Sequence, residues 1–448
     1  MSTLAFAVRR RESKLVGPAA PTARETKRLS DIDAHLPLRS HVQLMFFYRG
    51  VGRGSRAGGD DPAAVIRSAL AEALVPYYPL AGRVREVEAR KLVVDCTGEG
   101  VMFVEADADV RLAELEAAGG LRPPIPCVEQ LLFDVEVSNG ILNCPILLVQ
   151  VTRLLCGGFV LAIRLNHTLC DADGIAQFTS AVAELSRGLP APTVAPVWSR
   201  NLLDAPMLRH RKYDAVPPPP PPGPMVTRTF TFGSRDVAAI KKRLPRRLQD
   251  TATSFEALTA ALWRARTAAL ELPPAKEVWL VIVVNCRRLR ELGLPDGYYG
   301  NAVVPRAVVT TAGALLAASL GGAAEMVRAA KAAVTAEYVR WVADHLMLPG
   351  RPALAMGNIF VLSDNRHAGF HRVDFGWGVP AFGGVVTTPF GASFLLAVAD
   401  GDDGEEAMAV PIVLPRPAMD RFTSEMLEMT TSSISPVDPT ARPPRGRL

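Results

Sequence analysis

A run of prolines near the middle of the chain limits its folding more than any other feature. The stretch VPPPPPPGP, residues 216–224, fits neither a helix interior nor a central strand, because proline has no backbone N–H donor and a fixed φ. It favours an extended polyproline conformation instead. We therefore expect a crossover linker over residues 196–225, an N-terminal domain over 1–195 and a C-terminal domain over 226–448.

The composition is that of a globular protein with large apolar cores. Of the 448 residues, 49% are hydrophobic and 21% are charged. The formal net charge of +5 is small for this length and predicts no nucleic-acid partner. A mildly basic surface suits an anionic small molecule such as a nucleotide-bearing cofactor. No apolar stretch approaches the ~20 residues that a membrane-spanning helix needs, so no membrane span is expected.

The cysteines and the chain ends bear on location. The six cysteines include no C-x-x-C pair and no pair with zinc-ligand spacing, so we expect reduced, mostly buried thiols in an intracellular protein. The first residues lack the charge order of a signal peptide, which makes the cytoplasm the expected location. The C-terminal Gly446-Arg447-Leu448 is a poor version of the peroxisomal S-K-L type of tripeptide, and the peroxisome is the alternative.

Hydrophobic periodicity predicts that strands and helices mix in both halves of the chain. Strands are expected over 41–49, 91–96 and 277–287, with a strand hairpin at 146–166. Strands or turns are expected over 358–364, 372–378, 381–386 and 393–399. Helices are expected over 61–74, 174–188, 254–270 and 323–346, with Ser254 as the N-cap of the third. Because no regular βαβ repeat occurs, the pattern predicts an α/β (layered α+β) fold with two mixed-sheet domains.

The stretch IRLNHTLCDADG, residues 163–174, places one histidine and two aspartates straight after a predicted strand. Functional side chains often lie where a rigid element ends, and a histidine titrates near working pH. For a single histidine a hydrogen-bonded core role is the alternative, and Asp171 or Asp173 could cap the next helix. A second His-x-x-x-Asp, His210–Asp214, falls beside the proline run, where a base would lack fixed surroundings, so we treat it as coincidence.

Three chemistries use these residues. Metal binding by His167, Cys170 and Asp171 lacks a further ligand cluster, so no metal site is expected. An aspartyl-phosphate motif would need its first aspartate directly after the strand, but polar residues 166–168 intervene. In the third chemistry, His167 deprotonates an alcohol or amine that attacks an activated acyl group. That reaction needs one base, a place for the oxyanion and a tunnel for the donor, but no serine nucleophile.

A second motif, DFGWG at Asp374–Gly378, favours the third chemistry. By itself it predicts only a tight turn with an aromatic plug. Together, HTLCDADG and DFGWG, in this order and roughly two hundred residues apart, resemble the plant BAHD acyltransferase family, which moves acyl groups from coenzyme A thioesters to alcohols or amines. Segments that resemble the family in the same order are YYPLAGR at 77–83, SFEALTAALWRART at 254–267, LPDGYYGN at 294–301 and residues 361–378. The opening, residues 6–33, resembles specifically the benzyl alcohol O-benzoyltransferase group and its taxoid and aliphatic-alcohol relatives.

This resemblance implies an architecture of two chloramphenicol acetyltransferase-like domains with the base at a tunnel between them. It implies an acyl-CoA co-substrate, no permanently bound cofactor and a monomer. The implied reaction is benzoyl transfer from benzoyl-CoA to benzyl alcohol or a similar hydrophobic alcohol. A hydroxycinnamoyl- or acetyl-CoA-dependent transferase with another acceptor is one alternative. A catalytically inactive binding homologue is the second, and the intact His167 and DFGWG count against it.

The resemblance also implies roles for single residues. His167 matches the general base, which takes the acceptor's proton and returns it to the coenzyme A thiolate. Asp171 matches a structural aspartate that pairs with an arginine, and Arg287 is the expected partner; breaking such a buried pair leaves an unpaired charge. Asp173 and Gly174 are expected to serve the turn. A structural role away from the reacting atoms is implied for the DFGWG residues Asp374, Gly376, Trp377 and Gly378.

The oxyanion and donor sites are less directly indicated. Nine residues before Asp374 some relatives carry a tryptophan proposed to stabilise the oxyanion; here the residue is Asn365, whose amide N–H could substitute. Coenzyme A carries anionic phosphates, and Arg287, Arg288 and Arg290 cluster beside the GYYGN turn, so the nucleotide end is expected there. A solvated basic face is the alternative for Arg288 and Arg290. Ser363 and Asp364 are further donor-side candidates.

In this family the first strand partly lines the acceptor pocket. Here its alternation places Val42, Leu44 and Phe46 on one face. An apolar lining of this kind suits a hydrophobic alcohol; the alternative is that the same three residues face the core. His41 could hydrogen-bond an acceptor or simply end the preceding loop.

Overall fold

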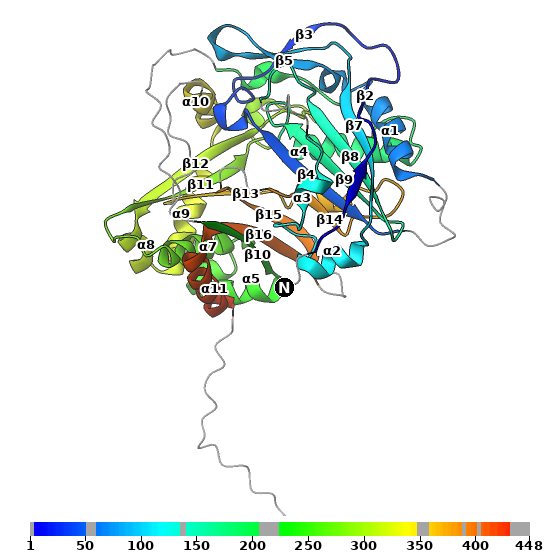
Figure 1. The fold of residues 1–448 in the computed structure, drawn as a ribbon. Helices are drawn as coiled ribbons and strands as arrows, with labels where there is room; N and C mark the ends of the chain where they lie inside the picture. Colours follow the sequence, from blue (N-terminus) through cyan, green and yellow to red (C-terminus); the bar gives the residue numbers. More distant parts are fainter. Residues whose placement is uncertain are drawn as a thin grey trace, which may run out of the picture.

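The computed structural model describes residues 4–50, 60–134, 140–205, 224–346, 358–387, 391–400 and 405–430. Over these ranges the chain builds a seven-stranded sheet, a six-stranded sheet and a small three-stranded sheet (Figure 1). The two large sheets both contain parallel and antiparallel pairs, so the expected mixed α/β fold is confirmed. His210–Asp214, residues 216–223 of the proline run and Gly446–Leu448 lie outside the described residues.

The seven-stranded sheet forms most of the first half. Its strands are β1 (Val8–Arg10), β2 (Lys14–Val16), β4 (His41–Tyr48), β7 (Val101–Ala108), β8 (Leu147–Leu154), β9 (Phe159–Asn166) and β14 (Phe382–Val385). They run in the order β1-β7-β8-β9-β4-β14, with β2 also paired to β7. The helices α1 (Pro62–Ala73) and α4 (Ala172–Ser186) pack against each other and bury one face of this sheet, through Leu44 and Phe46 of β4 among others. Asp61 caps α1 by accepting from the Ala64 N–H at 3.2 Å.

The three-stranded sheet and two short helices complete the first half. The small sheet has the order β3-β6-β5 and lies above the seven-stranded sheet in Figure 1. Its strands are β3 (Thr26–Arg28), β5 (Arg83–Glu86) and β6 (Leu92–Asp95), and the helices are α2 (Leu112–Gly119) and α3 (Val128–Leu131). None of the helices in the described ranges is long and apolar enough to cross a membrane.

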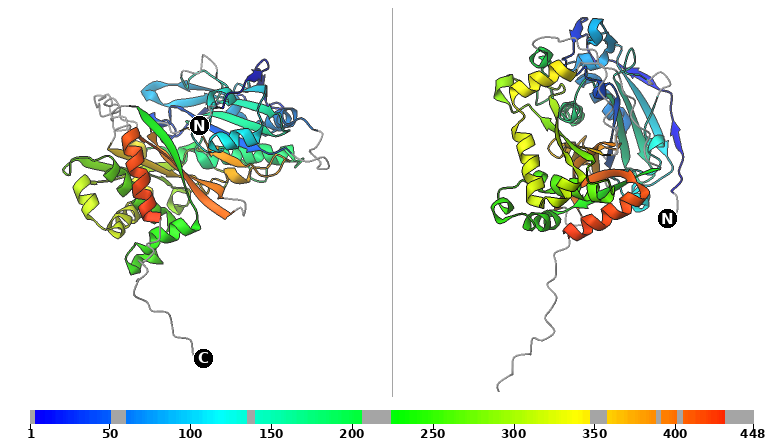
Figure 2. Two further views of the ribbon diagram at one scale, coloured as in Figure 1. Left: turned by 60° about the horizontal axis from the view of Figure 1, so that its bottom comes forward. Right: turned by 90° about the vertical axis from the view of Figure 1, so that its left-hand side faces the viewer.

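The six-stranded sheet forms the second half. It runs β10-β16-β15-β13-β11-β12, with strands β10 (Met225–Phe232), β11 (Glu277–Asn285), β12 (Val303–Thr311), β13 (Ile359–Asp364), β15 (Ser393–Asp400) and β16 (Glu405–Pro415). Its helices are α5 (Ser234–Lys242), α6 (Arg246–Gln249), α7 (Ser254–Ala269), α8 (Ala312–Ala317), α9 (Leu320–Ala332), α10 (Ala336–Leu346) and α11 (Arg416–Thr430). Both views in Figure 2 place most of this green-to-red half on one side of the blue-to-cyan half.

An apolar cluster joins the two large sheets. Met45 and Phe47 of β4 belong to the same buried cluster as Leu396 of β15 and Ala409 of β16. The side chains of β4 therefore alternate between the core beneath α1 and α4 and the contact with the second half, which explains why almost the whole strand is apolar.

Two local features differ from the expected elements. The N-cap of α7 is Thr253, one residue before the expected Ser254; Thr253 and Glu256 exchange side-chain to backbone hydrogen bonds, which is a capping box. The expected helix over 323–346 is divided into α9 and α10, because Thr335 turns its hydroxyl to the Tyr338 N–H and starts a new helix.

β14 adds a connection between the halves. This strand belongs to the C-terminal half of the sequence but pairs antiparallel with β4 in the first sheet. Gly383 makes this approach possible, because a Cβ there would lie 2.7 Å from the Phe370 carbonyl oxygen and 2.8 Å from a Phe46 ring carbon. The division into 1–195, 196–225 and 226–448 stays a proposal, with β14 contributed across it.

Candidate active site

His167 follows β9 directly and is held by its backbone. Its N–H donates to the Ser40 carbonyl at 2.9 Å, and its ring Nδ1 lies 3.0 Å from the Cys170 carbonyl oxygen. Because a carbonyl can only accept, this contact places the proton of the neutral ring on Nδ1 and leaves Nε2 with a free lone pair. Burial lowers the pKa of His167, although part of the residue's surface stays accessible. A neutral ring held in this way can accept a proton at Nε2.

Asp171 faces Arg287. The two terminal nitrogens of Arg287 each lie 2.8 Å from an Asp171 carboxylate oxygen. The carboxylate also accepts from the N–H groups of Gly174 at 3.0 Å and Ala302 at 2.9 Å. Burial alone would raise the pKa of Asp171, but the Arg287 charge and these hydrogen bonds outweigh it and lower the pKa. All of these partners belong to the start of α4 and the second half, which suits a structural role.

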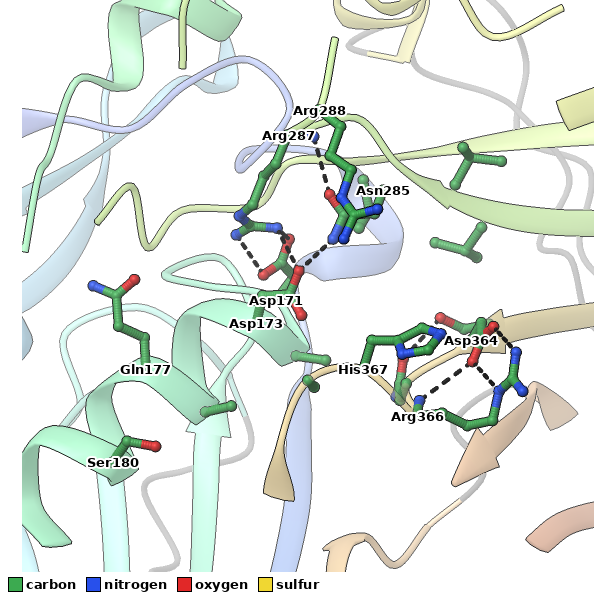
Figure 3. A pocket seen from close by; sticks show the side chains of 18 of the residues that line it. Asp171, Asp173, Gln177, Ser180, Asn285, Arg287, Arg288, Asp364, Arg366 and His367 are labelled. Atoms are coloured by element: carbon green, nitrogen blue, oxygen red, sulfur yellow. Dashed lines mark hydrogen bonds and ion pairs between the residues drawn. The ribbon is translucent and has the colours of Figure 1, made fainter. Parts of the chain in front are cut away.

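Asp173 and Gly174 complete the first turn of α4. Asp173 accepts hydrogen bonds from Asn285 and, at 3.3 Å, from Arg287. Burial, followed by the neighbouring charge of Asp171, raises the pKa of Asp173. A Cβ on Gly174 would lie 2.1 Å from the Tyr299 carbonyl oxygen, so only glycine fits at this contact. Figure 3 shows Asp171 and Asp173 directed from α4 toward Arg287 and Asn285.

A pocket of about 810 Å³ lies beside this ion pair, between α4 and the second half. Of the residues singled out from the sequence, it is lined by Asp171, Asp173, Arg287, Arg288, Ser363, Asp364 and Asn365. Residues that sequence reasoning missed also line it; they include Gln177, Thr253, Phe255, Asn285, Lys331, Arg366 and His367. The N-cap expected at Ser254 marked the start of α7 to within one residue, but nothing in the sequence placed that helix end at a pocket.

The arginines beside the GYYGN turn differ in position. Arg288 lines the pocket, whereas Arg290 is exposed and does not line it, so the structure favours Arg288 over the expected Arg290 as a donor-side residue. Both terminal nitrogens of Arg287 are engaged by Asp171, Asp173 and the Gly300 carbonyl. Arg287 therefore lines the pocket as a structural residue, and its guanidinium is not aimed at an anionic ligand.

The end of β13 forms another wall of the pocket, drawn in Figure 3 across from Asp171. Asn365 is buried, and its Oδ1 accepts from the Ser363 hydroxyl at 3.0 Å. Within the described part of the chain its Nδ2 has no hydrogen-bond partner, so this amide retains a donor. Asp364 binds Arg366 through two contacts of 2.6 and 2.8 Å, which compensates its charge.

The structure does not bring the four residues expected from β4 to this pocket. Val42, Leu44 and Phe46 belong to the core cluster beneath α1 and α4, and Leu44 and Phe46 have no exposed surface. The alternative that this face of β4 packs in the core therefore describes the structure. His41 pairs in register with Asn166, next to His167. Its Nε2 is buried without a hydrogen-bond partner among the described residues.

DFGWG forms a turn at the far end of β9 from His167. The Asp374 carboxylate accepts from the N–H groups of Gly376 and Gly378 at 2.7 and 2.9 Å. Both glycines have positive φ, +106° and +84°, a conformation that other residues rarely adopt. Trp377 packs edge-on against Phe159, the first residue of β9, with ring centroids 5.4 Å apart. The motif holds the second half against the first sheet, and it contacts neither the pocket nor His167.

Metal binding finds no support in the side-chain geometry. Within the described ranges, no three side chains of His, Cys, Asp or Glu lie close enough together to hold a metal ion. Around His167 in particular, the Asp171 carboxylate is committed to Arg287, and the Cys170 thiol is buried with its pKa raised by that burial.

Comparisons with known proteins agree on one family. The model of the family described as the Transferase family matches residues 6–429. Benzyl alcohol O-benzoyltransferases from Petunia hybrida and Nicotiana tabacum are 48% and 47% identical to this chain, over 96% and 95% of it and 95% and 94% of their own lengths. A (Z)-3-hexen-1-ol acetyltransferase from Arabidopsis thaliana is 44% identical, covering 94% of this chain and 95% of its own.

Among solved structures, vinorine synthase has a similar fold, with a TM-score of 0.73 at 20% identity over 94% of this chain and 98% of its own. TRI101 of F. graminearum, complexed with coenzyme A and T-2 mycotoxin, has a TM-score of 0.68 at 16% identity, over 89% and 97%. The family match spans nearly all of the chain, and the two motifs lie within it in the expected order. The chain therefore belongs to the Transferase family, the BAHD acyltransferases.

Proposed function

We propose that this chain transfers benzoyl from benzoyl-CoA to benzyl alcohol or a similar hydrophobic alcohol. The observation that carries the proposal is the state of His167, whose Nδ1 faces the Cys170 carbonyl oxygen at 3.0 Å and whose Nε2 has no hydrogen-bond partner within the described ranges. The choice of benzoyl and benzyl alcohol rests on the two relatives with 48% and 47% identity, whose names specify them. The acyl-CoA acts as a co-substrate that leaves as coenzyme A.

In the proposed reaction, Nε2 of His167 takes the proton from the acceptor hydroxyl while the oxygen attacks the thioester carbonyl carbon. The tetrahedral intermediate collapses, the C–S bond breaks, and the imidazolium returns the proton to the thiolate of coenzyme A. Because burial lowers the pKa of His167, the ring is neutral and able to accept at physiological pH. Asp171 takes no proton in this scheme, since its carboxylate is held by Arg287.

Asn365 is the proposed oxyanion donor. The Ser363 hydroxyl fixes the Oδ1 side of the amide, so Nδ2 is the end left to donate. A donor that is already oriented in a buried site costs no reorganisation when negative charge develops on the carbonyl oxygen.

The pocket beside Asp171 is the proposed donor site. Arg288 and Lys331 line it and provide cations for the phosphates of coenzyme A. The start of α7, with Thr253 and Phe255 in the lining, adds the partial positive charge of a helix N-terminus. Ser363 and Asp364 are proposed for the same side, although the Arg366 contact lowers the repulsion that Asp364 would exert on phosphates. Arg290 remains the weakest of the proposed donor-side residues because it lies outside the lining.

Acetyl transfer is the second candidate, favoured by the 44% identity with a (Z)-3-hexen-1-ol acetyltransferase. A panel of benzoyl-, acetyl- and hydroxycinnamoyl-CoA against benzyl alcohol, hexenol and an amine separates the candidates. The thiol released from each pair is measured, and the ester or amide is identified by mass spectrometry. Benzyl benzoate formation at the highest kcat/KM supports the first candidate. Binding of acyl-CoA without thiol release by the folded protein would indicate a binding homologue and contradict the proposal.

We also propose that the chain is a monomer and works in the cytoplasm, with the peroxisome as the alternative. The six cysteines are free and four of them are buried, which suits a reducing compartment. Light scattering after size-exclusion chromatography measures the mass of the particle. A fluorescent tag at the N-terminus, which leaves Gly446-Arg447-Leu448 free, distinguishes diffuse from peroxisomal fluorescence.

A further inference from the structure

Asp33 is a buried carboxylate that joins three distant parts of the chain. It has no exposed surface, and its two oxygens accept from the backbone N–H and hydroxyl of Ser30, from Arg200 and from Asn301. Ser30 belongs to the N-terminal segment, Arg200 to the expected crossover and Asn301 to the second half. A buried carboxylate that accepts from this many donors fixes the position of each of them.

Arg200 connects Asp33 to the loop that follows His167. Its Nη1 lies 2.9 and 3.0 Å from the Asp33 oxygens, and its Nη2 donates to the Leu169 carbonyl at 2.7 Å. The guanidinium lies over the ring of Trp198, 4.3 Å from the ring centroid. A Cβ on Gly300 would lie 2.1 Å from Nη1, so this glycine leaves the space that Arg200 occupies.

Asn301 reaches the base itself. Its Nδ2 donates to the His167 carbonyl at 2.9 Å and to Asp33 at 2.8 Å, while its buried Oδ1 has no partner among the described residues. Nδ2 of the Asn301 amide therefore has two acceptors, whereas the amide oxygen has no donor within the described ranges. An amide held in this way positions the group that it donates to, because any other orientation would break both bonds.

We propose that Asp33, Arg200 and Asn301, here the Asp33 cluster, are positioning residues for His167. The Asp33 cluster binds the His167 and Leu169 carbonyls, on either side of residue 168, and so fixes the Cys170 carbonyl that keeps the proton on Nδ1 of His167. This inference rests on the proposed role of His167 as the base. It adds that the direction of Nε2 depends on a crossover arginine and on an asparagine of the second half.

Two variants weaken the Asp33 cluster without removing its carboxylate. Asn301→Ala deletes the donor to the His167 carbonyl but keeps the Asn301 backbone N–H bond to Asp33. Arg200→Lys keeps a positive charge, but a compact ammonium cannot reproduce the planar fork that binds Asp33 and the Leu169 carbonyl together. The control is Arg153→Lys, which breaks a two-point arginine contact with Asp61. Arg153 lies in β8, at the end of the seven-stranded sheet opposite His167.

The first readout is independent of activity. In protein labelled with ¹⁵N only at histidine, the ring-nitrogen shifts of His167, assigned by their absence in His167→Ala, report the tautomer and the pKa. The wild type and Arg153→Lys should show one neutral tautomer with the proton on Nδ1. In Asn301→Ala and Arg200→Lys both tautomers should appear, and the pKa of His167 should rise toward its ordinary value as water enters. Unchanged His167 signals in both folded variants would overturn the inference, whether or not the wild type transfers acyl groups.

The second readout uses turnover. In an active wild type, kcat of Asn301→Ala and Arg200→Lys should fall on the order of 10²-fold, the usual cost of displacing a reacting group by about 1 Å. KM for the acyl-CoA should change little, and the rising limb of the pH profile should move to higher pH. Arg153→Lys should keep kcat. An equal loss of kcat in the control would overturn the inference. A wild type that releases no coenzyme A would contradict only the proposed function.

Discussion

Arg287 binds Asp171 through both terminal nitrogens, each 2.8 Å from a carboxylate oxygen. One residue begins α4 in the first half and the other follows β11 in the second, so this ion pair fastens the two halves together beside His167. The contact gives Asp171, four residues after His167, a structural position that requires no part in the proposed chemistry.

The first prediction concerns that aspartate. Asp171→Ala removes the two-point carboxylate contact of the partly buried Arg287 guanidinium and leaves the Ala302 N–H without its acceptor. We expect the free energy of unfolding to fall by about 3–5 kcal/mol, the usual cost of breaking a buried ion pair. Urea denaturation followed by circular dichroism measures it. A variant with wild-type stability that has lost turnover would contradict the structural role.

The second prediction concerns His167. His167→Ala should lower kcat by about 10²–10⁴-fold, the contribution expected of a general base. The fold should persist, because Asp171, Arg287 and the backbone of the loop remain. Thiol release from acyl-CoA measures the rate, and the melting temperature serves as the control. Turnover within a few fold of wild type would show that another group accepts the proton.

The third prediction concerns pH. In the proposed reaction a neutral His167 accepts the proton, so kcat/KM should rise with pH as the ring loses its charge, and fall below its pKa. Because burial lowers this pKa from the ordinary value of about 6.5, activity should persist to lower pH than an exposed histidine would allow. His371, whose pKa is also lowered by burial, provides the control. In His371→Gln the apparent pKa of the kcat/KM profile should stay unchanged. A shifted apparent pKa in that variant would contradict its assignment to His167.

Sequence periodicity predicted the elements whose buried face follows a regular period within one segment of the chain. The strand over 41–49, the helix over 61–74 and the hairpin at 146–166 match β4, α1 and the β8–β9 pair, because each buries one face with a regular period. The division between α9 and α10 was missed, since the hydrophobic period continues across Thr335 and only its hydroxyl contact marks the break. The place of β14 beside β4 is a tertiary contact that no local pattern encodes.

The site was predictable only in part for the same reason. The residues 163–174 stand out locally, but their division into a base and a structural aspartate came from the family resemblance. Arg287 lies 116 residues from Asp171, and Asn301 lies 268 residues from Asp33, so the spacing carries no signal for either contact. The alternation in β4 correctly predicted that Val42, Leu44 and Phe46 share one face of the strand. Whether that face contacts a substrate or the core depends on where α1 and α4 pack, which the strand's own sequence does not show.

The fourth prediction concerns Asn365. Asn365→Ala removes the free Nδ2 donor from the pocket, and kcat should fall by about 10²–10³-fold, as for loss of one oxyanion donor. KM for the acyl-CoA should change little, since the donor acts on charge that develops only in the transition state. Ser363→Ala, which frees the amide to rotate, should give a smaller loss of kcat. An unchanged kcat in Asn365→Ala would remove this residue from the mechanism.

The fifth prediction separates the DFGWG turn from the chemistry. Trp377 is buried against Phe159, at the opposite end of β9 from His167. Trp377→Ala should lower the free energy of unfolding by about 3–5 kcal/mol, the usual cost of truncating a large core aromatic side chain. In the fraction that folds, kcat should remain near wild type, because the turn contacts neither the pocket nor the base. Active-site titration with a tight-binding acyl-CoA analogue gives that fraction. A kcat that falls while stability is retained would mean that this turn acts on the reacting groups from the far end of the strand.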